Sequence, residues 1–122
     1  MPDKIPIGII GATGRLGSTL VRKLLSHPEF KLAAAVARDA ASLNRDIGSL
    51  LNLSVTGILV QSEIAQLSQS CRVVIDTTAP AATEQWAQRC AIDRIPYLVA
   101  STGLTSEDQD ALNTAAKLIP VL

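Results

Sequence analysis

Short apolar runs alternate with longer segments of mixed polarity along the whole chain. Each run has the length of a strand and is too short for a helix, and polar or turn-forming residues follow it. Uninterrupted apolar runs of this kind are typical of strands buried on both faces of a sheet. The predicted strands are Ile5 to Ile10, Phe30 to Ala37, Ile58 to Val60, Val73 to Ile75, Tyr97 to Ala100, and a last one that begins at Ile119 and reaches Leu122.

Helical spacing is found between these strands. From Leu16 onwards the apolar residues recur every three or four positions and Pro28 closes the pattern, which predicts a helix that ends near His27. Pro80 suits the first turn of a second helix, because its missing N–H has no partner there in any case. The apolar side of this second helix is formed by Trp86, Ala87 and Cys90.

A third helix has two overlapping start signals. Thr105-Ser-Glu-Asp and Ser106-Glu-Asp-Gln both resemble capping boxes, in which a side chain and the residue three positions later bond each other's backbone N–H. We expect this helix to continue through Lys117. The segment from Asp39 to Gly57 has no comparable signal and is predicted only as a loop, with helical turns left open.

Strands that alternate with amphipathic helices indicate right-handed crossovers and a parallel sheet covered on both faces. The predicted fold class is therefore α/β, a doubly wound Rossmann-like sheet in a single domain that spans residues 1–122. With 48% apolar and 18% charged residues, the composition is that of a packed domain and argues against disorder.

A glycine-rich turn lies between the first strand and the first helix. Gly11 can take the positive φ that a tight turn needs, Gly14 leaves no Cβ where a diphosphate approaches, and Gly17 lets the helix lie close to the strand. The helix N-terminus directs N–H groups and a partial positive charge at phosphates. The predicted dinucleotide cradle is Gly11, Ala12, Thr13, Gly14, Arg15, Leu16 and Gly17.

Two alternative roles for the glycine turn can be compared with dinucleotide binding. The glycines can simply form a tight turn, as in α/β proteins that bind nothing there. A mononucleotide P-loop is excluded, because no Gly-Lys-Ser/Thr follows to hold a phosphate and magnesium.

The end of the second strand bears on the choice between NAD and NADP. An acidic residue about 20 positions beyond the glycines usually binds the ribose 2′-hydroxyl of NAD. Here Ala37 has no carboxylate, whereas Arg38 can hold a 2′-phosphate through charge-assisted hydrogen bonds. Asp39 either turns back to the ribose and retains some use of NAD, or pairs with Arg38. The sequence predicts NADPH as the cofactor, with NADH as the alternative.

Polar residues follow two further strands. Ligands of open parallel sheets bind outside the carboxyl ends of the strands, so we expect these residues to face the ribose and nicotinamide end of the cofactor. For the two threonines, capping of the next helix is an equally good interpretation. The residues are Thr77, Thr78, Ala100, Ser101 and Thr102.

Charge and composition exclude several partner classes. The 11 basic and 11 acidic residues cancel, so we expect neither a nucleic-acid partner nor an anionic membrane surface. No apolar stretch approaches the roughly 18 residues of a membrane span, and no signal peptide is visible, which predicts a cytoplasmic protein. Cys71 and Cys90 lack the spacing of metal ligands, so no metal site is predicted and both are interpreted as buried structural thiols.

Four motifs stand in a specific order along the chain: the Gly11 to Gly17 turn, Ala37-Arg38, the Asp76-x-Thr78-x-Pro80 strand end, and Ser101-Thr102-Gly103-Leu104. In order and spacing they resemble the N-terminal domain of the dihydrodipicolinate reductase family, also named 4-hydroxy-tetrahydrodipicolinate reductase. The resemblance runs from Ile5 to the last residue. It implies that Gly11 to Leu16 hold the pyrophosphate, that Arg38 contacts the 2′-phosphate, and that Ala100 to Thr102 contact the nicotinamide side.

The resemblance also implies a reaction, hydride transfer from NAD(P)H to a cyclic unsaturated dicarboxylate on the route to diaminopimelate and lysine. In the family, a histidine pair, a lysine and a Pro-Ser-Gly-Thr loop lie in a following domain that also builds a tetramer, and this chain has no counterpart. His27, interpreted as a helix-end charge or a surface residue, and Lys117 are not placed to donate a proton. No catalytic residue is predicted, and cofactor binding without turnover is expected.

The chain departs from the family pattern at two positions. Ala100 stands where Gly is common, and Ala37 stands where many members have an acidic residue. Two alternatives remain open at this point, a stand-alone NAD(P)-sensing module and the cofactor domain of another two-domain dehydrogenase, such as a sugar oxidoreductase or a semialdehyde dehydrogenase.

Overall fold

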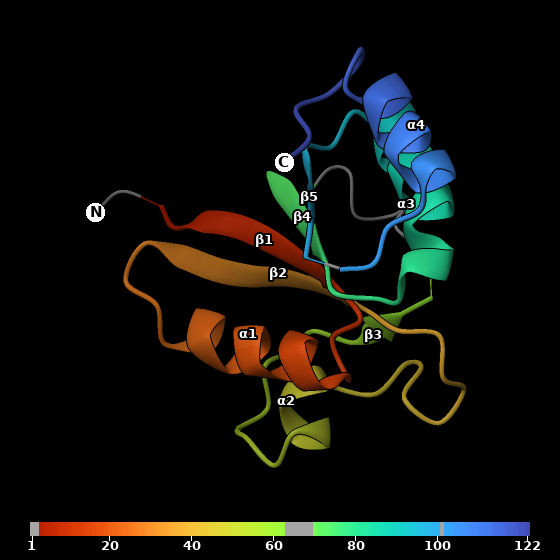
Figure 1. Ribbon diagram of the computed structural model, residues 1–122. Coiled ribbons are helices and arrows are strands. Elements are labelled where there is room, and N and C mark those ends of the chain that lie inside the picture. Colours follow the sequence, from red (N-terminus) through yellow and green to blue (C-terminus); the bar gives the residue numbers. More distant parts are fainter. Residues whose placement is uncertain (1–2, 63–69, 101) are drawn as a thin grey trace.

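The computed structural model describes residues 3–62, 70–100 and 102–122, and its centre is a five-stranded parallel sheet (Figure 1). The strands are β1 Ile5–Ile10, β2 Phe30–Val36, β3 Val60–Gln61, β4 Val73–Asp76 and β5 Tyr97–Val99. The helices are α1 Arg15–Leu25, α2 Ile47–Leu50, α3 Thr83–Ile92 and α4 Ser106–Ala115, with a 3₁₀ turn, η1 Pro80–Ala82, before α3.

Helices cover both faces of the sheet. α1 and α2 lie on one face, and α3 and α4 pack side by side on the other (Figure 1). The strand order is β3-β2-β1-β4-β5, so the winding direction reverses between β1 and β4. The doubly wound Rossmann-like fold is therefore confirmed. In such sheets ligands bind in the crevice at the carboxyl ends of the strands where the order reverses, which here is the end of β1 and β4.

β1 anchors two separate halves of the core because its side chains alternate between the faces. Ile9 is fully buried in the cluster beneath α1, and Ile10 is 1% exposed in the cluster beneath α3 and α4. Burial of one such side chain contributes about 1.5 to 3 kcal/mol. The end of β1, directly before the glycine turn, is thus fixed by packing on both faces of the sheet.

The strand ends differ from the prediction by one or two residues. β2 ends at Val36 and β5 at Val99, one residue early, while β4 continues one residue further than expected. β3 begins at Val60 rather than Ile58. The reason is that the Ile58 carbonyl accepts the Ile47 amide at 2.9 Å, which ties this segment to α2 instead of to the neighbouring strand.

The predicted last strand, Ile119 to Leu122, is reduced to a single parallel bridge between Tyr97 and Val121. The Tyr97 amide donates to the Pro120 carbonyl at 3.0 Å, and the Leu122 amide donates to the Tyr97 carbonyl at 3.1 Å. The segment therefore runs along β5 at the edge of the sheet.

α1 ends at Leu25, two residues before the predicted end. Nδ1 of His27 accepts the backbone amides of Glu29 at 3.0 Å and Phe30 at 3.2 Å, which turns the chain into β2. The helix therefore ends before His27, whose ring accepts hydrogen bonds from the residues that lead into β2. This side chain closes a turn.

The start of α4 matches one of its two predicted capping boxes. The Thr105 hydroxyl accepts the Asp108 amide at 3.1 Å, and the Asp108 carboxylate accepts the Thr105 amide at 2.9 Å. The box at Ser106 is not formed, because Ser106 is already the first helical residue. The helix ends at Ala115, so Lys117 lies in the turn that follows.

The segment predicted as a loop contains α2 and is organised around one carboxylate. Asp46 accepts the amides of Ser49 at 2.9 Å and Gly57 at 2.7 Å, and the hydroxyl of Thr56 at 3.0 Å. Partial burial acts to raise the pKa of Asp46, but these hydrogen bonds outweigh it and lower the pKa to about 2. The middle of this segment and its C-terminal end are therefore tied to one ionised group.

The Asp46 network makes a pH-dependent contribution to stability. A carboxyl group whose pKa is depressed by folding stabilises the fold above its unfolded pKa of about 3.9, and this contribution is lost as the pH falls toward about 2. We expect the urea midpoint of Asp46→Asn to lie below that of the wild type at about pH 6, with a smaller gap at about pH 2.5. Equal gaps at the two pH values would contradict the role of this carboxylate.

Both thiols are buried and free, as predicted. Burial, more than any neighbouring charge, raises the pKa of Cys90 to about 12, and burial also raises the pKa of Cys71. A thiol with a raised pKa is protonated and a poor nucleophile at neutral pH. Cys71 and Cys90 are therefore packing residues.

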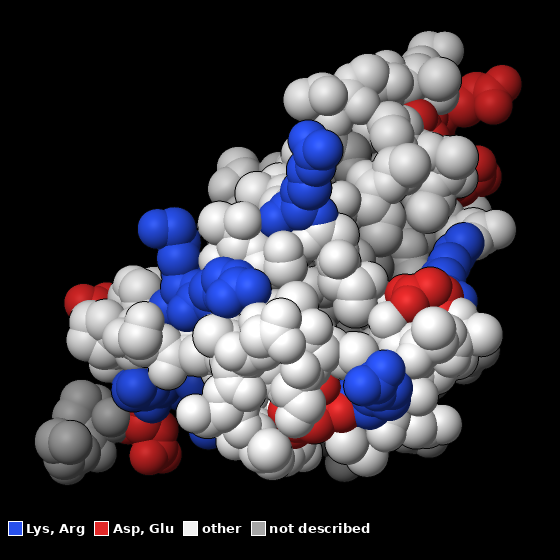
Figure 2. Space-filling model, turned by 90° about the horizontal axis from the view of Figure 1, so that it is seen from below, with Lys and Arg blue, Asp and Glu red and all other residues white. Residues whose placement is uncertain are grey.

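The surface carries its charges in small groups. On the face shown in Figure 2, Lys and Arg side chains form separate patches with acidic side chains between them. Phosphate recognition on that face would have to rest on local contacts rather than on a broad positive field. Within the described ranges, no helix combines the length and apolarity that crossing a bilayer requires.

Candidate functional site

The turn between β1 and α1 needs two of its glycines for different reasons. Gly11 has a φ of 84°, in the region that side chains disfavour. A Cβ at Gly17 would lie 1.9 Å from the Gly11 carbonyl oxygen, so no side chain fits between α1 and the turn. The predicted conformational role of Gly11 and the predicted packing role of Gly17 are both confirmed.

Gly14 is different because its backbone is unstrained. Its φ of −76° and ψ of 178° suit any residue, and a Cβ there would have only the Gly11 carbonyl oxygen as a neighbour, at 3.4 Å. The fold itself therefore leaves open space beside Gly14. A bare backbone beside open space is the property that lets a diphosphate approach.

Backbone hydrogen bonds fix the turn but leave the helix end open. The amides of Gly11 and Ala12 donate to the Val36 carbonyl at 2.8 and 3.1 Å, which fastens the turn to β2. The N-terminus of α1 has no side-chain cap and no acidic residue in its first turn, whereas the N-terminus of α4 is closed by the Thr105 box. The amides and partial positive charge of α1 are therefore available to an external anion.

Two threonines follow β4, and the first of them holds this turn. The Thr77 hydroxyl donates to the carbonyl oxygens of Ile10 at 2.8 Å and Gly11 at 3.2 Å. The amide of Thr78 donates to the Asp76 carboxylate at 2.8 Å, and its hydroxyl bonds the same oxygen. The interpretation of these threonines as helix caps is wrong, since neither η1 nor α3 has a side-chain cap. Thr77 instead joins the end of β4 to the end of β1, and Thr78 bonds Asp76 at the end of its own strand.

Asp76 is the buried centre of this strand end. It is fully buried, and it accepts a hydrogen bond from the hydroxyl of Tyr97 on β5 in addition to those from Thr78. Burial, and then the nearby Asp76 carboxyl group, raises the pKa of Tyr97 well above its ordinary value. The hydroxyl therefore stays protonated and acts as a donor, which locks β4 to β5 beneath the crevice.

Arg38 reaches across the mouth of the crevice from the end of β2 to α3. Its Nη2 donates to Oε1 of Gln85 at 2.9 Å. Its guanidinium lies over the ring of Trp86, with Cζ 5.1 Å from the ring centroid. A cation over an aromatic face at this distance is attracted to it, so the side chain is held at two points.

Asp39 takes part in a different set of contacts. Its carboxylate accepts the hydroxyl of Thr13 at 3.2 Å and that of Ser42. The Ser42 hydroxyl is the main cause that lowers the pKa of Asp39. No carboxylate in the described ranges forms an ion pair with Arg38, so the expected alternative of an Arg38–Asp39 pair is not realised.

These elements surround a cavity of about 260 Å³ at the carboxyl ends of β1, β2 and β4. Six of the predicted binding residues line it, and they come from three separate stretches of the chain. The lining residues are Ile10, Gly11, Thr13, Gly14, Val36, Ala37, Arg38, Asp39, Thr77, Thr78 and Trp86.

The remaining predicted residues lie outside the cavity lining. Ala12 is fully buried behind the turn, while Arg15 and Leu16 are exposed at the start of α1. Ala100 donates its amide to the Asp76 carbonyl at 2.9 Å at the end of β5, and Thr102 is exposed nearby in the chain. Ser101 lies outside the described residues.

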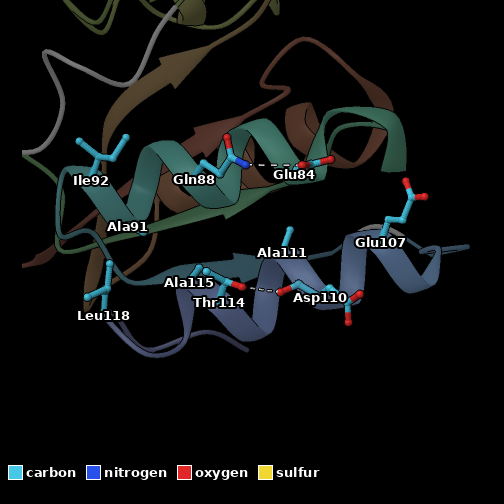
Figure 3. A pocket seen from close by; sticks show the side chains of 10 residues that line it. All are labelled: Glu84, Gln88, Ala91, Ile92, Glu107, Asp110, Ala111, Thr114, Ala115 and Leu118. Atoms are coloured by element: carbon cyan, nitrogen blue, oxygen red, sulfur yellow. Dashed lines mark hydrogen bonds between the residues drawn. The ribbon is translucent and has the colours of Figure 1, made fainter.

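A larger hollow, of about 600 Å³, lies between α3 and α4 (Figure 3). Its acidic residues, Glu84, Glu107 and Asp110, gather at one end, and the exposed Ile92 and Leu118 stand at the other. It shares no lining residue with the cavity beside the glycine turn. The two depressions are therefore separate features.

The sequence pattern of the family described as "Dihydrodipicolinate reductase, N-terminus" matches residues 5–122. The chain belongs to this family. A 4-hydroxy-tetrahydrodipicolinate reductase from Acinetobacter baumannii is 38% identical over 117 residues, which cover 95% of this chain and 42% of the relative. The chain thus spans less than half the length of this dihydrodipicolinate reductase. The match sets aside the alternative of a sugar oxidoreductase or a semialdehyde dehydrogenase.

Solved structures share the fold at lower identity. Dipicolinate-bound dihydrodipicolinate reductase from Paenisporosarcina sp. TG-14 has a TM-score of 0.71 at 19% identity, over 93% of this chain and 43% of that one. Aspartate semialdehyde dehydrogenase with NADP from Candida albicans has a TM-score of 0.68 at 19% identity, over 82% of this chain and 30% of that one. Both likenesses support the same sheet architecture.

Two residues that contact Arg38 have no clear signal in the sequence. The pattern assigns Trp86 to the apolar side of a helix, and the structure also places it beside the cavity, beneath Arg38. Gln85 carries no motif, and it meets Arg38 only because α3 starts at the same edge of the sheet where β2 ends. Proximity to a strand end is the one signal that could have found them.

Proposed function

We propose that this chain binds NADPH in the cavity beside the glycine turn, as the nucleotide-binding domain of a 4-hydroxy-tetrahydrodipicolinate reductase. The observation that carries the proposal is the uncapped N-terminus of α1, which opens at the point where the strand order reverses. The residues fit a dinucleotide, since the space beside Gly14 is open and the helix has no acidic residue in its first turn.

Each part of the cofactor has a proposed set of partners. Thr13, Gly14 and the amides of Arg15 and Leu16 hold the diphosphate, while Gly11, Ala12 and Gly17 shape the turn. Arg38 binds the 2′-phosphate of NADPH through its planar set of donors. Thr77 and Thr78, and then Ala100, Ser101 and Thr102, face the ribose and the nicotinamide.

The proposed reaction is reduction of a cyclic unsaturated dicarboxylate, in which the bound cofactor supplies the hydride. This chain binds and orients the dinucleotide. The proton donor, the dicarboxylate site and the tetramer contacts belong to the further domain that the family resemblance implies. We also propose that the protein is located in the cytoplasm.

Removal of the Arg38 side chain tests the cofactor assignment. A charge-assisted hydrogen bond is worth about 1.5 to 3 kcal/mol, so Arg38→Ala should weaken NADPH binding about tenfold or more and change NADH binding by less than about twofold. Isothermal titration calorimetry of the 122-residue chain with each cofactor measures both constants.

The matched control is Arg89→Ala, which removes an equal charge from α3, where Arg89 pairs with Asp93 at 3.1 Å. It should leave the affinities for both cofactors unchanged. Failure of the wild type to bind either cofactor would refute the proposed function. Equal wild-type affinities for NADPH and NADH would refute only the preference.

A further inference from the structure

The contacts of Arg38 join the two halves of the doubly wound sheet. Arg38 follows β2, on the side of the sheet order that contains β3, whereas Gln85 belongs to α3, which follows β4. The hydrogen bond between them spans 47 positions of the chain and is 2.9 Å long. It therefore lies across the crevice at the reversal of the strand order.

The partner that holds Arg38 is neutral. A carboxylate in the place of the Gln85 amide would neutralise the guanidinium and compete with a phosphate for it. The nearest acidic residue in the sequence, Asp39, is instead engaged by the hydroxyls of Thr13 and Ser42. Arg38 is thus fixed in position while its charge stays available.

Gln85 uses a small part of the binding capacity of Arg38. A guanidinium has five N–H donors, and the contact with Gln85 is made through Nη2. Trp86 supports one face of the planar group, which restricts its rotation without occupying a donor. The remaining edge can still form the paired hydrogen bonds that suit a phosphate.

We propose that Gln85 is a positioning residue that selects NADPH over NADH, because it holds the Arg38 guanidinium across the crevice where a ribose 2′-phosphate binds. This rests on the proposed function. A flexible arginine loses rotamer freedom when it binds a phosphate, and an arginine already held in place loses less. The gain applies only to a ligand that carries the 2′-phosphate, so Gln85 affects the ratio of the two affinities.

Two substitutions separate position from charge. Gln85→Ala removes the acceptor, and we expect it to weaken NADPH binding about threefold to tenfold while NADH binding changes by less than about twofold. Gln85→Glu keeps an acceptor but adds a negative charge, and we expect a larger loss for NADPH. The matched control is Gln88→Ala one turn further along α3, where Gln88 bonds Glu84 and does not line the cavity. It should leave both constants unchanged.

The same titrations in an Arg38→Ala background decide whether Gln85 acts through Arg38. There, Gln85→Ala should have no further effect on NADPH binding. If Gln85→Ala leaves the NADPH to NADH ratio at the wild-type value, or lowers both affinities equally, the inference fails while the proposed function stands. If the wild-type chain binds neither cofactor, the proposed function fails first.

Discussion

Gly17→Ala should destabilise the domain by about 3 kcal/mol and weaken NADPH binding more than about tenfold. The new Cβ would lie 1.9 Å from the carbonyl oxygen and 2.7 Å from the carbonyl carbon of Gly11. Both are backbone atoms of a turn held by Val36 and Thr77, so no flexible side chain can yield, and overpacking of this kind costs about 1 to 3 kcal/mol or more. α1 must then move away from the turn. Urea unfolding followed by circular dichroism measures the loss.

Gly14→Ala is the matched control for this prediction, because it adds the same methyl group at an earlier glycine of the same turn. Its backbone angles suit alanine, and its Cβ would meet only the Gly11 carbonyl oxygen, at 3.4 Å. Stability should stay within about 1 kcal/mol of the wild type and can rise, since alanine restricts the unfolded chain. NADPH binding should still fall, because the methyl group enters the proposed diphosphate space. Unchanged unfolding of Gly17→Ala would contradict the packing role of Gly17.

The sheet and the glycine turn were predictable because their signals are local. The apolar run from Ile5 to Ile10 can be recognised as a strand without knowledge of its partner strands. The spacing of Gly11 and Gly17 follows from the steric requirements of a single turn. The same is true of Thr105, whose capping partner Asp108 lies in the first turn of the same helix. Features of this kind are readable from neighbouring residues alone.

Features that depend on distant partners were misjudged. Thr77 follows a strand and precedes a helix, so local rules suggest a cap, yet its hydroxyl bonds carbonyls 66 and 67 positions away. Asp39 stands beside Arg38 in sequence, but its carboxylate accepts the hydroxyl of Ser42, three positions on, and that of Thr13, 26 positions away. A polar side chain can form a local hydrogen bond or a distant one of similar energy. Tertiary packing decides which of the two forms.

The same limit explains the shortened elements. Ile58 has the side chain of a strand residue, but its carbonyl is taken by Ile47, a pairing that only the folded 39–57 segment creates. His27 has the position of a helix-end charge, but two backbone amides at the start of β2 use its Nδ1 as an acceptor. Apolar periodicity finds elements, and hydrogen-bond partners set their ends.

Asp76→Ala should cost about 3 to 5 kcal/mol, a large part of the total stability of about 5 to 15 kcal/mol typical of a domain. Asp76 is fully buried and accepts hydrogen bonds from the Tyr97 hydroxyl and from both the amide and the hydroxyl of Thr78. Truncation leaves the buried Tyr97 hydroxyl and the half-buried donors of Thr78 without this acceptor, and a buried donor without a partner costs about 1 to 3 kcal/mol. Chemical denaturation of the purified variant gives the value directly.

Tyr97→Phe separates the hydrogen bond from the packing at the same place. The ring of Tyr97, which is 1% exposed, would keep its position in the core beneath α3 and α4, and only one donor to Asp76 would disappear. We expect a loss of about 1 to 3 kcal/mol, smaller than that of Asp76→Ala, because Oδ1 of Asp76 still accepts the Thr78 amide at 2.8 Å and only Oδ2 loses its donor. A combined variant should lose less than the sum of the two, since both changes remove the same contact. Strict additivity would mean that Asp76 and Tyr97 stabilise the fold independently, and the proposed lock between β4 and β5 would then be wrong.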